Sequence, residues 1–233
     1  MKRLAASLLS LVAAACSTVP DYRTVATDLG GGMVAVPAGL FTMGDDAGEQ
    51  DEQPPRPVRL SGFLIDPFEV TNGAYSACVE AGACRPLDGY EGSVRHPVVT
   101  VSWFDAERFC TFVGKRLPSE AEWERAARGT GAHRYPWGSN SISPAQANVR
   151  HVNRAAGKTM TIDTLRAGRS SVGAFHMSGN VAEWVADDYD PTVYQRMVAE
   201  QGPRPEEGGQ KVVRGGSFRS VAYVARVSAR ASR

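Results

Sequence analysis

The sequence has no surplus of either charge and, after its N-terminal region, no long apolar run. Its 26 Lys and Arg residues face 25 Asp and Glu residues, so the formal net charge is +1 over 233 residues. Nucleic-acid-binding proteins usually have a basic surplus or stripe, and this balance disfavours a nucleic-acid partner. No later segment approaches the roughly 18 apolar residues that a membrane-spanning helix needs. A hydrophobic content of 42% and a charged content of 22% exclude disorder over most of the chain.

Histidine is scarce, and its four positions show no spacing typical of metal ligands. His96, His133, His151 and His176 form no His-x-x-x-His pair, so a structural hydrogen bond is the simpler interpretation for each. The chain also lacks the Gly-x-Ser-x-Gly sequence that places a nucleophilic serine on a sharp strand-to-helix turn. A histidine-bound metal and a serine hydrolase are both disfavoured.

Cysteine is scarce too, with four residues and none after Cys110. The first, Cys16, ends a segment in which Lys2 and Arg3 precede an apolar stretch, 4–12, that is too short to span a bilayer. Small residues followed at once by cysteine are typical of a bacterial lipobox, in which the cysteine is lipidated and becomes the new N-terminus. An ordinary cleavable signal peptide with an incidental cysteine is the alternative.

We therefore expect a lipoprotein signal peptide at 1–15, a lipidated Cys16 with a tether over 16–32, and a folded domain over 33–233. Ser17, directly after the lipidation site, is compatible with sorting to the outer membrane. The expected location is the bacterial cell envelope, with the lipid in the outer membrane and the domain facing the periplasm. The expected partners are the membrane, through the anchor, and an envelope protein or peptide.

Export makes a disulfide the preferred interpretation of two neighbouring cysteines. Thr71 can cap a short helix at 72–81 and Gly82 can end it, so that Cys84 turns back toward Cys78. The sequence therefore predicts a disulfide between Cys78 and Cys84 at the end of a helix.

Two further helices are marked by their caps. Ser102, with an acidic residue three positions later, begins a helix that Gly114 ends, and Ser119 begins another that Gly129 ends. Cys110 falls on the apolar stripe of the first of these helices. We expect it to be a buried thiol that behaves as a small hydrophobe.

The rest of the chain predicts strands and loops. Residues 33–44 and 58–70 are strand-like, and the acidic, proline-rich stretch 45–57 predicts an exposed loop. Little helical periodicity is found over 130–233. The 24 glycines and 14 prolines of the sequence indicate a loop-rich fold with few long helices.

Six sequence blocks carry a specific resemblance to a known family. In chain order they are Val36-Pro-Ala-Gly-Leu-Phe-Thr-Met-Gly44, His96-Pro-Val-Val-Thr-Val-Ser-Trp103, Gly114-Lys-Arg-Leu-Pro-Ser-Glu-Ala-Glu-Trp-Glu-Arg-Ala-Ala-Arg-Gly129, Tyr135-Pro-Trp-Gly138, Ser178-Gly-Asn-Val-Ala-Glu-Trp184 and Val213-Arg-Gly-Gly-Ser-Phe218. Together they resemble the formylglycine-generating-enzyme (sulfatase-modifying-factor) domain over nearly the whole expected mature chain. The resemblance implies an α+β fold: a single irregular, loop-rich domain with a C-type-lectin-like core.

The resemblance also identifies a departure from the oxidases of this family. Those enzymes bind copper(I) through two cysteines shortly after the Arg-Gly-Gly-Ser block, and a soft cation prefers such thiolates. Here Ser220 occupies about the position of the first ligand, and either Ala222 or Ala225 that of the second. Hydroxyl and methyl groups cannot replace two thiolates. Copper is therefore not expected as a cofactor, and formylglycine formation by that mechanism is disfavoured.

Calcium is the cofactor that the resemblance implies, in a structural role. Family members hold Ca²⁺ with the oxygen ligands that a hard cation prefers. The first site maps to the Asn148 side chain, the Val149 carbonyl, the Asp163 carboxylate and the Leu165 carbonyl. The second maps to His176, the carbonyls of Gly179 and Val181, and Glu183. The family usually has Asp or Asn at the position of His176, and imidazole is a poor calcium ligand. Loop capping, or an ion pair with a nearby arginine, is the alternative for both carboxylates.

The sequence thus favours an envelope lipoprotein whose domain acts as a binding or scaffold module, and it assigns no catalytic residue. The alternative is an oxidoreductase of the same family that acts on a protein cysteine, or on another substrate, with a non-standard site.

Overall fold

The structure is a computed structural model that describes residues 32–88, 92–152, 157–199 and 209–233. The expected signal peptide 1–15 and the expected lipidation site Cys16 lie outside the described residues. Within those ranges, no helix combines the length and the apolar character needed to cross a membrane.

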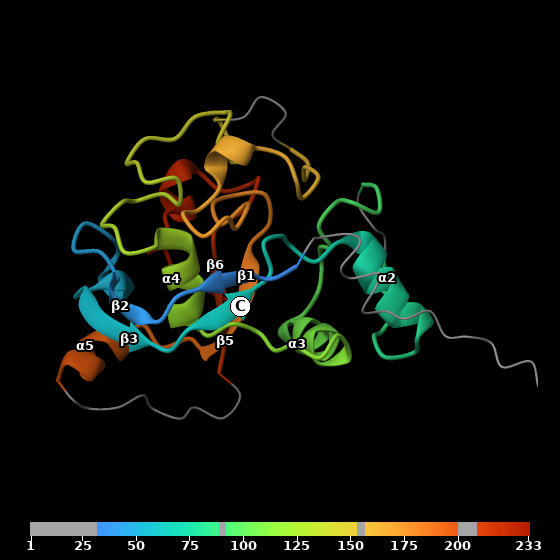
Figure 1. The fold of residues 1–233 in the computed structure, drawn as a ribbon, viewed down its shortest axis with the longest axis horizontal. Helices are drawn as coiled ribbons and strands as arrows, with labels where there is room; N and C mark the ends of the chain where they lie inside the picture. The colour runs from blue at the N-terminus through green and yellow to red at the C-terminus, as the bar shows by residue number, and fades with distance from the viewer. Residues whose placement is uncertain (1–31, 89–91, 153–156, 200–208) are drawn as a thin grey trace, which may run out of the picture.

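Four short strands form two antiparallel pairs near the start of the domain. β1 (Val34–Val36) pairs with β4 (Phe63–Ile65), and β2 (Gly39–Met43) pairs with β3 (Arg56–Leu60). In Figure 1 these strands lie on the same side of the ribbon as helix α4, while α2 lies at the opposite end.

The two long strands expected at 33–44 and 58–70 are therefore wrong in extent, because each is divided. Pro37 lies between β1 and β2, and proline has no amide hydrogen to donate to a ladder. Gly62 lies between β3 and β4. After each break the chain pairs with a different strand. The first and last strands of the segment, β1 and β4, therefore pair with each other, and β2 pairs with β3.

The stretch 45–57, expected as an exposed loop, contains a buried carboxylate. It includes a 3-10 turn, η1 (Gln50–Glu52), in which Glu52 is only 1% exposed. The guanidinium of Arg226 donates to both carboxylate oxygens of Glu52, at 2.7 and 2.9 Å. The loop is thereby held against the C-terminal segment, and the expectation of full exposure is wrong at this residue.

Helix α2 (Asn72–Glu80) begins and ends as the sequence predicts, apart from one residue at its end. The Thr71 hydroxyl accepts a hydrogen bond from the Ala74 amide at 3.1 Å. Gly82 takes a positive φ of 71°, a conformation that glycine adopts readily, and the chain turns back there. The disulfide between Cys78 and Cys84 is confirmed, and both cysteines are buried.

Helices α3 (Trp103–Phe112) and α4 (Glu120–Arg128) both begin at the predicted capping boxes. Gly114 and Gly129 follow their last turns with positive φ values of 71° and 70°. Side chains of α4 and of a C-terminal sheet form the main core. That sheet has the order β5-β6-β7 and consists of β5 (Glu183–Asp188), β6 (Lys211–Arg214) and β7 (Ala231–Ser232).

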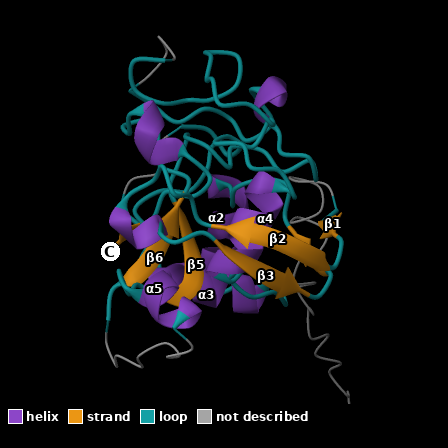
Figure 2. Cartoon of the chain, turned by 90° about the vertical axis from the view of Figure 1, so that its left-hand side faces the viewer, coloured by secondary structure: helices purple, strands orange, loops and turns teal. Residues whose placement is uncertain are grey.

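The part of the chain after residue 130 is mostly loop, as the sequence indicates. Figure 2 shows loops covering one end of the molecule, above the strands. In its described residues the only α-helix is α5 (Val193–Val198), and the 3-10 turns η2 (Arg166–Gly168) and η3 (Ala222–Ala225) are the other helical segments.

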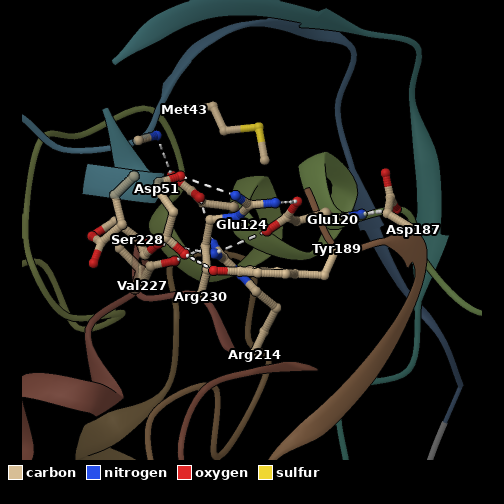
Figure 3. Close-up of polar contacts among 12 residues, drawn as sticks. Met43, Asp51, Glu120, Glu124, Asp187, Tyr189, Arg214, Val227, Ser228 and Arg230 are labelled. Carbon is tan, nitrogen blue, oxygen red and sulfur yellow. Dashed lines mark hydrogen bonds and ion pairs between the residues drawn. The ribbon is translucent and has the colours of Figure 1, made fainter. Parts of the chain in front are cut away.

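Buried ion pairs connect α4 to the C-terminal segment, as Figure 3 shows. Arg214 of β6, which is 1% exposed, donates to Glu124 and, at 3.3 Å, to Glu120. Arg230 donates to both oxygens of Glu120, at 2.7 and 3.0 Å. Glu124 also accepts from the Gly44 amide at 2.9 Å. These contacts join the N-terminal strands, α4 and the chain end into one unit.

Candidate functional site

A groove of about 550 Å³ opens among the described residues. Its walls come from β4 and the segment that leads into α2, from α3, and from the segment 175–184. Apolar side chains dominate these walls, among them those of Phe63, Ile65, Val101, Phe109, Val113 and Trp184. The volume is in the range of about 300–1,000 Å³ that is usual for ligand sites in proteins.

Two carboxylates, Glu69 and Glu183, lie in this apolar groove. Glu69 precedes α2 and accepts hydrogen bonds from the Asn180 amide group, at 2.8 and 3.1 Å, and from the Val181 backbone amide at 3.2 Å. Glu183 begins β5 and accepts a hydrogen bond from the Trp123 indole at 2.8 Å. Both residues are partly buried. Two hydrogen-bonded carboxylates thus lie among the apolar side chains of the groove.

Burial raises the pKa of Glu183 to about 7. Burial, and then the nearby charge of Glu183, raise the pKa of Glu69 well above its ordinary value. Neither carboxylate forms an ion pair with any described residue. A negative charge in such surroundings is costly without a cation beside it.

The charges at the edge of the groove, by contrast, are paired. Lys115 donates to Asp66 at 2.6 Å, and Arg116 forms two hydrogen bonds of 2.7 Å with Glu122. All four of these residues contribute to the lining. The two cations that line the groove are therefore engaged with other carboxylates.

Cys110 lines the groove and is partly exposed, so the expectation of a fully buried thiol is wrong. Its neighbours on the apolar stripe, Ala106, Phe109 and Val113, line the same groove, and Phe109 also packs against Tyr75 of α2. Burial nevertheless raises the pKa of the thiol to about 11. At neutral pH the group is therefore a protonated thiol.

The segment 217–225, which corresponds to the copper-binding segment of the family's oxidases, lies outside the lining of this groove. The Ser220 hydroxyl accepts a hydrogen bond from the Ser217 amide at 3.0 Å. Ala222 and Ala225 begin and end η3, and the Ala225 carbonyl accepts from the buried Ser178 hydroxyl at 2.6 Å. The positions that would hold two thiolates instead hold parts of a hydrogen-bonded turn.

The first predicted calcium site has one feature that suits a hard cation. The Oδ1 atom of Asn148 is buried and has no hydrogen-bond partner among the described residues, while its Nδ2 donates to the Lys158 carbonyl at 3.0 Å. Asp163 forms an ion pair of 2.8 Å with Arg95, and the Leu165 carbonyl accepts from the Gly168 amide at 2.8 Å. A calcium ion held by Asn148, Val149, Asp163 and Leu165 would therefore compete with these contacts. This site stays a prediction.

The residues of the second predicted site are divided between two places. Burial lowers the pKa of His176 to about 4, and its Nε2 lies 3.5 Å from the Thr164 hydroxyl, beside the first site. Gly179 pairs with Asn148 through a β-bridge. Val181 and Glu183, by contrast, line the groove. A neutral imidazole supplies no oxygen ligand, so the donor set suits calcium poorly.

No group of three or more His, Cys, Asp or Glu side chains suited to a metal ion occurs among the described residues. The two predicted sites are connected, however, through a residue that the sequence did not single out. The Asn180 side chain accepts from Asn148 at 3.1 Å and donates to Glu69. Asn180 has a positive φ of 63°, which Asn tolerates better than most residues.

Glu69 is the other functional candidate that sequence reasoning missed. The only local signal is an acidic residue between Phe68 and Val70, two positions before the helix cap Thr71. Its partners lie more than a hundred positions later in the chain. Nothing near Glu69 in the sequence indicates that it shares a groove with Glu183.

These observations define an α+β domain with a C-type-lectin-like fold and a groove apart from the segment that binds copper in the oxidases. The chain matches the Sulfatase-modifying factor enzyme 1-like domain over residues 19–233, and it belongs to this family. The expectations for the family and for the fold class are confirmed.

Relatives in this family include enzymes with different chemistry. The chain is 34% identical to the formylglycine-generating enzyme of Thermomonospora curvata, over 80% of this chain and 82% of that protein. It is 30% identical to the hercynine oxygenase of Mycolicibacterium smegmatis, over 86% of this chain and 57% of that protein.

Solved structures agree with this assignment. PvdO from Pseudomonas aeruginosa superposes with a TM-score of 0.74 at 26% identity, over 86% of this chain and 87% of that one. Treponema denticola variable protein 1 has a TM-score of 0.68 at 23% identity, over 86% and 88% of the two chains, which is a likeness of fold.

Proposed function

We propose that this protein is an envelope lipoprotein whose domain binds a segment of a partner protein and does not oxidise cysteine by copper chemistry. The support for a binding role is the groove, which combines apolar walls with the two carboxylates Glu69 and Glu183. Apolar clefts with a few convergent polar groups are the usual form of a binding site.

The observation that carries the proposal is the separation of this groove from segment 217–225. That segment supplies none of the lining, and it contains no cysteine at Ser220, Ala222 or Ala225. A copper(I) site needs soft ligands, which hydroxyl and methyl groups do not provide. The groove can therefore bind a partner without any part of the oxidase machinery.

The proposed location follows from the N-terminal sequence. Lys2 and Arg3, the short apolar stretch and the cysteine at position 16 favour lipidation, and Ser17 is compatible with the outer membrane. We place the domain in the periplasm, where a tether over 16–32 would keep it near the membrane.

Copper binding by the mature chain, 16–233, separates the binding role from the oxidase alternative. A Cys16→Ser variant would be purified without lipid and titrated with copper(I) against a competing chelator. It would then be incubated with oxygen and a cysteine-containing peptide of the kind that formylglycine-generating enzymes modify. We expect weak copper binding and an unchanged peptide mass.

The same titration with an added Cys110→Ser exchange is the matched control, because it removes the one thiol outside the disulfide in this variant. Any copper bound through that thiol would disappear, whereas binding at 217–225 would remain. Copper-dependent conversion of the peptide cysteine to an aldehyde would refute the proposal and establish the oxidoreductase alternative.

A further inference from the structure

The groove meets an open edge of strand β4. Phe63, Leu64 and Ile65 all line it, although successive side chains of a strand point to opposite faces. A groove lined by three consecutive strand residues therefore runs along the strand's edge and not over one face alone. In the described sheets β4 is hydrogen-bonded to a single strand, β1, so its other edge has no strand partner.

Apolar surface continues from the groove onto its rim. Leu64 is 59% exposed and Met33 is 37% exposed, and both belong to the lining. A small ligand held inside the groove would leave these side chains in water. A chain that passes through the groove and over its rim would cover them, which favours a protein segment as the occupant.

The charges of the groove indicate what that segment carries. Glu69 and Glu183 line the groove and form no ion pair with a described residue, whereas the lining cations Lys115 and Arg116 are already paired. An ammonium or guanidinium group that entered the groove would gain charge-assisted hydrogen bonds to carboxylates in apolar surroundings. An acidic segment would meet two further carboxyl groups there and would gain no such hydrogen bonds.

We propose that the groove receives an extended segment of a partner protein, which adds to the free edge of β4 and presents a Lys or Arg side chain, flanked by apolar residues, to Glu69 and Glu183. Backbone pairing would supply affinity that does not depend on sequence, and the two carboxylates would supply the selectivity. This inference rests on the proposed binding function and specifies the partner's chemistry.

Selection from a random heptapeptide library tests the proposal. The mature chain carrying Cys16→Ser would be the bait, in buffer with a calcium chelator so that no metal ion screens the carboxylates. We expect the selected peptides to share a central Lys or Arg between apolar residues. Exchange of that residue for norleucine, which keeps the apolar stem and removes the charge, should weaken binding at least ten-fold.

A separate measurement shows whether the peptide binds in the groove. Cys110 lines the groove and is partly exposed, so a seated peptide should slow its alkylation by a maleimide. A Glu183→Gln variant keeps an oxygen that can accept from Trp123, and it should lose most of the preference for the charged peptide over its norleucine form. Glu107→Gln is the matched control, because Glu107 is an exposed acid on α3 outside the lining.

Equal binding of the charged and norleucine peptides would overturn the proposal. If both protected Cys110, the groove would still be a binding site and the proposed function would stand. Selection of acidic or uncharged peptides, or of no peptide, would overturn it as well. An oxidase result in the copper experiment would refute the proposed function, while the affinity ratio of the two peptides would still decide this inference.

Discussion

Replacement of Asp105 by Asn tests how the α3 wall of the groove is held in place. The Asp105 carboxylate accepts hydrogen bonds from the Ser102 amide at 2.8 Å and from the Ser102 hydroxyl at 2.6 Å. It also accepts two hydrogen bonds of 2.7 Å from Arg85, which follows the disulfide. One side chain thus caps α3 and joins that helix to the end of α2.

The magnitude follows from the pKa of this group. Burial alone would raise it, but hydrogen bonds from Arg85 and Ser102 lower the pKa of Asp105 from 3.8 to about 2. A difference of this size corresponds to about 2.4 kcal/mol before solvent screening. Arg85 is 52% exposed, which reduces its share, so we expect Asp105→Asn to cost about 1–2 kcal/mol at pH 7.

The pH dependence has a defined sign. Because the folded-state pKa lies below the ordinary value of 3.8, the carboxylate stabilises the fold above that pH, and the stabilisation is lost as pH falls through about 2. Urea unfolding of the wild type and the variant should therefore differ most at neutral pH. The difference should fall to about half near pH 3.

Asp46→Asn is the matched control, since it removes the same charge from an exposed residue. It should change the free energy of unfolding by less than about 0.5 kcal/mol at any pH. If Asp105→Asn left the unfolding free energy unchanged at pH 7, or if its effect were the same at pH 3, the assigned role of this carboxylate would be wrong.

Three further predictions concern the anchor, the disulfide and calcium. Cys16→Ala should abolish acyl labelling and release the protein from the membrane fraction, and unchanged retention would exclude the lipid anchor. Alanine at both Cys78 and Cys84 should lower the free energy of unfolding by about 2–3 kcal/mol in urea titrations, because the closed loop restricts the unfolded chain, and no loss would contradict that reasoning. Calcium should raise the melting temperature because only the folded state presents Asn148 Oδ1 and its neighbours, and Asp163→Ala should remove most of that shift. A melting curve indifferent to both calcium and chelator would leave these residues as loop caps.

The local features of the fold were predictable because their causes lie within a few residues. The serine caps of α3 and α4 receive their hydrogen bonds from amides three positions later. The disulfide closes over a separation of six residues. Hydrogen bonds and turns of this range depend on neighbouring residues, and a single sequence contains all the participants.

The misjudged features depend on partners far along the chain. Glu52 is buried because Arg226, 174 positions later, pairs with it. Cys110 is partly exposed because it lines a groove to which other segments of the chain contribute. The acidic, proline-rich sequence around Glu52 gives no sign of its burial, and the apolar stripe of α3 gives no sign that Cys110 is partly exposed. Tertiary contacts decide both.

The candidate site was predictable only in part, for the same reason. Glu183 was identified through the family resemblance, as a calcium ligand. Glu183 lines the same apolar groove as Glu69 because the segment before α2 and the start of β5 contribute to one lining. Asn180, which joins Glu69 to Asn148, had no assigned role at all. Neither charge pattern nor spacing brings these residues together.

The sequence blocks that carry the family resemblance contain residues that stabilise the fold. This explains how the fold can form without the copper ligands. Arg214 of the Arg-Gly-Gly-Ser block forms the buried ion pair with Glu124 of α4. Gly215, at a φ of 84°, has Trp123 so close that a Cβ atom would lie 3.2 Å from the indole ring. The same indole donates to Glu183. Such residues specify packing and turns, so their presence identifies the domain while its chemistry depends on other side chains. A chain can therefore keep every block and still have lost the two thiolates.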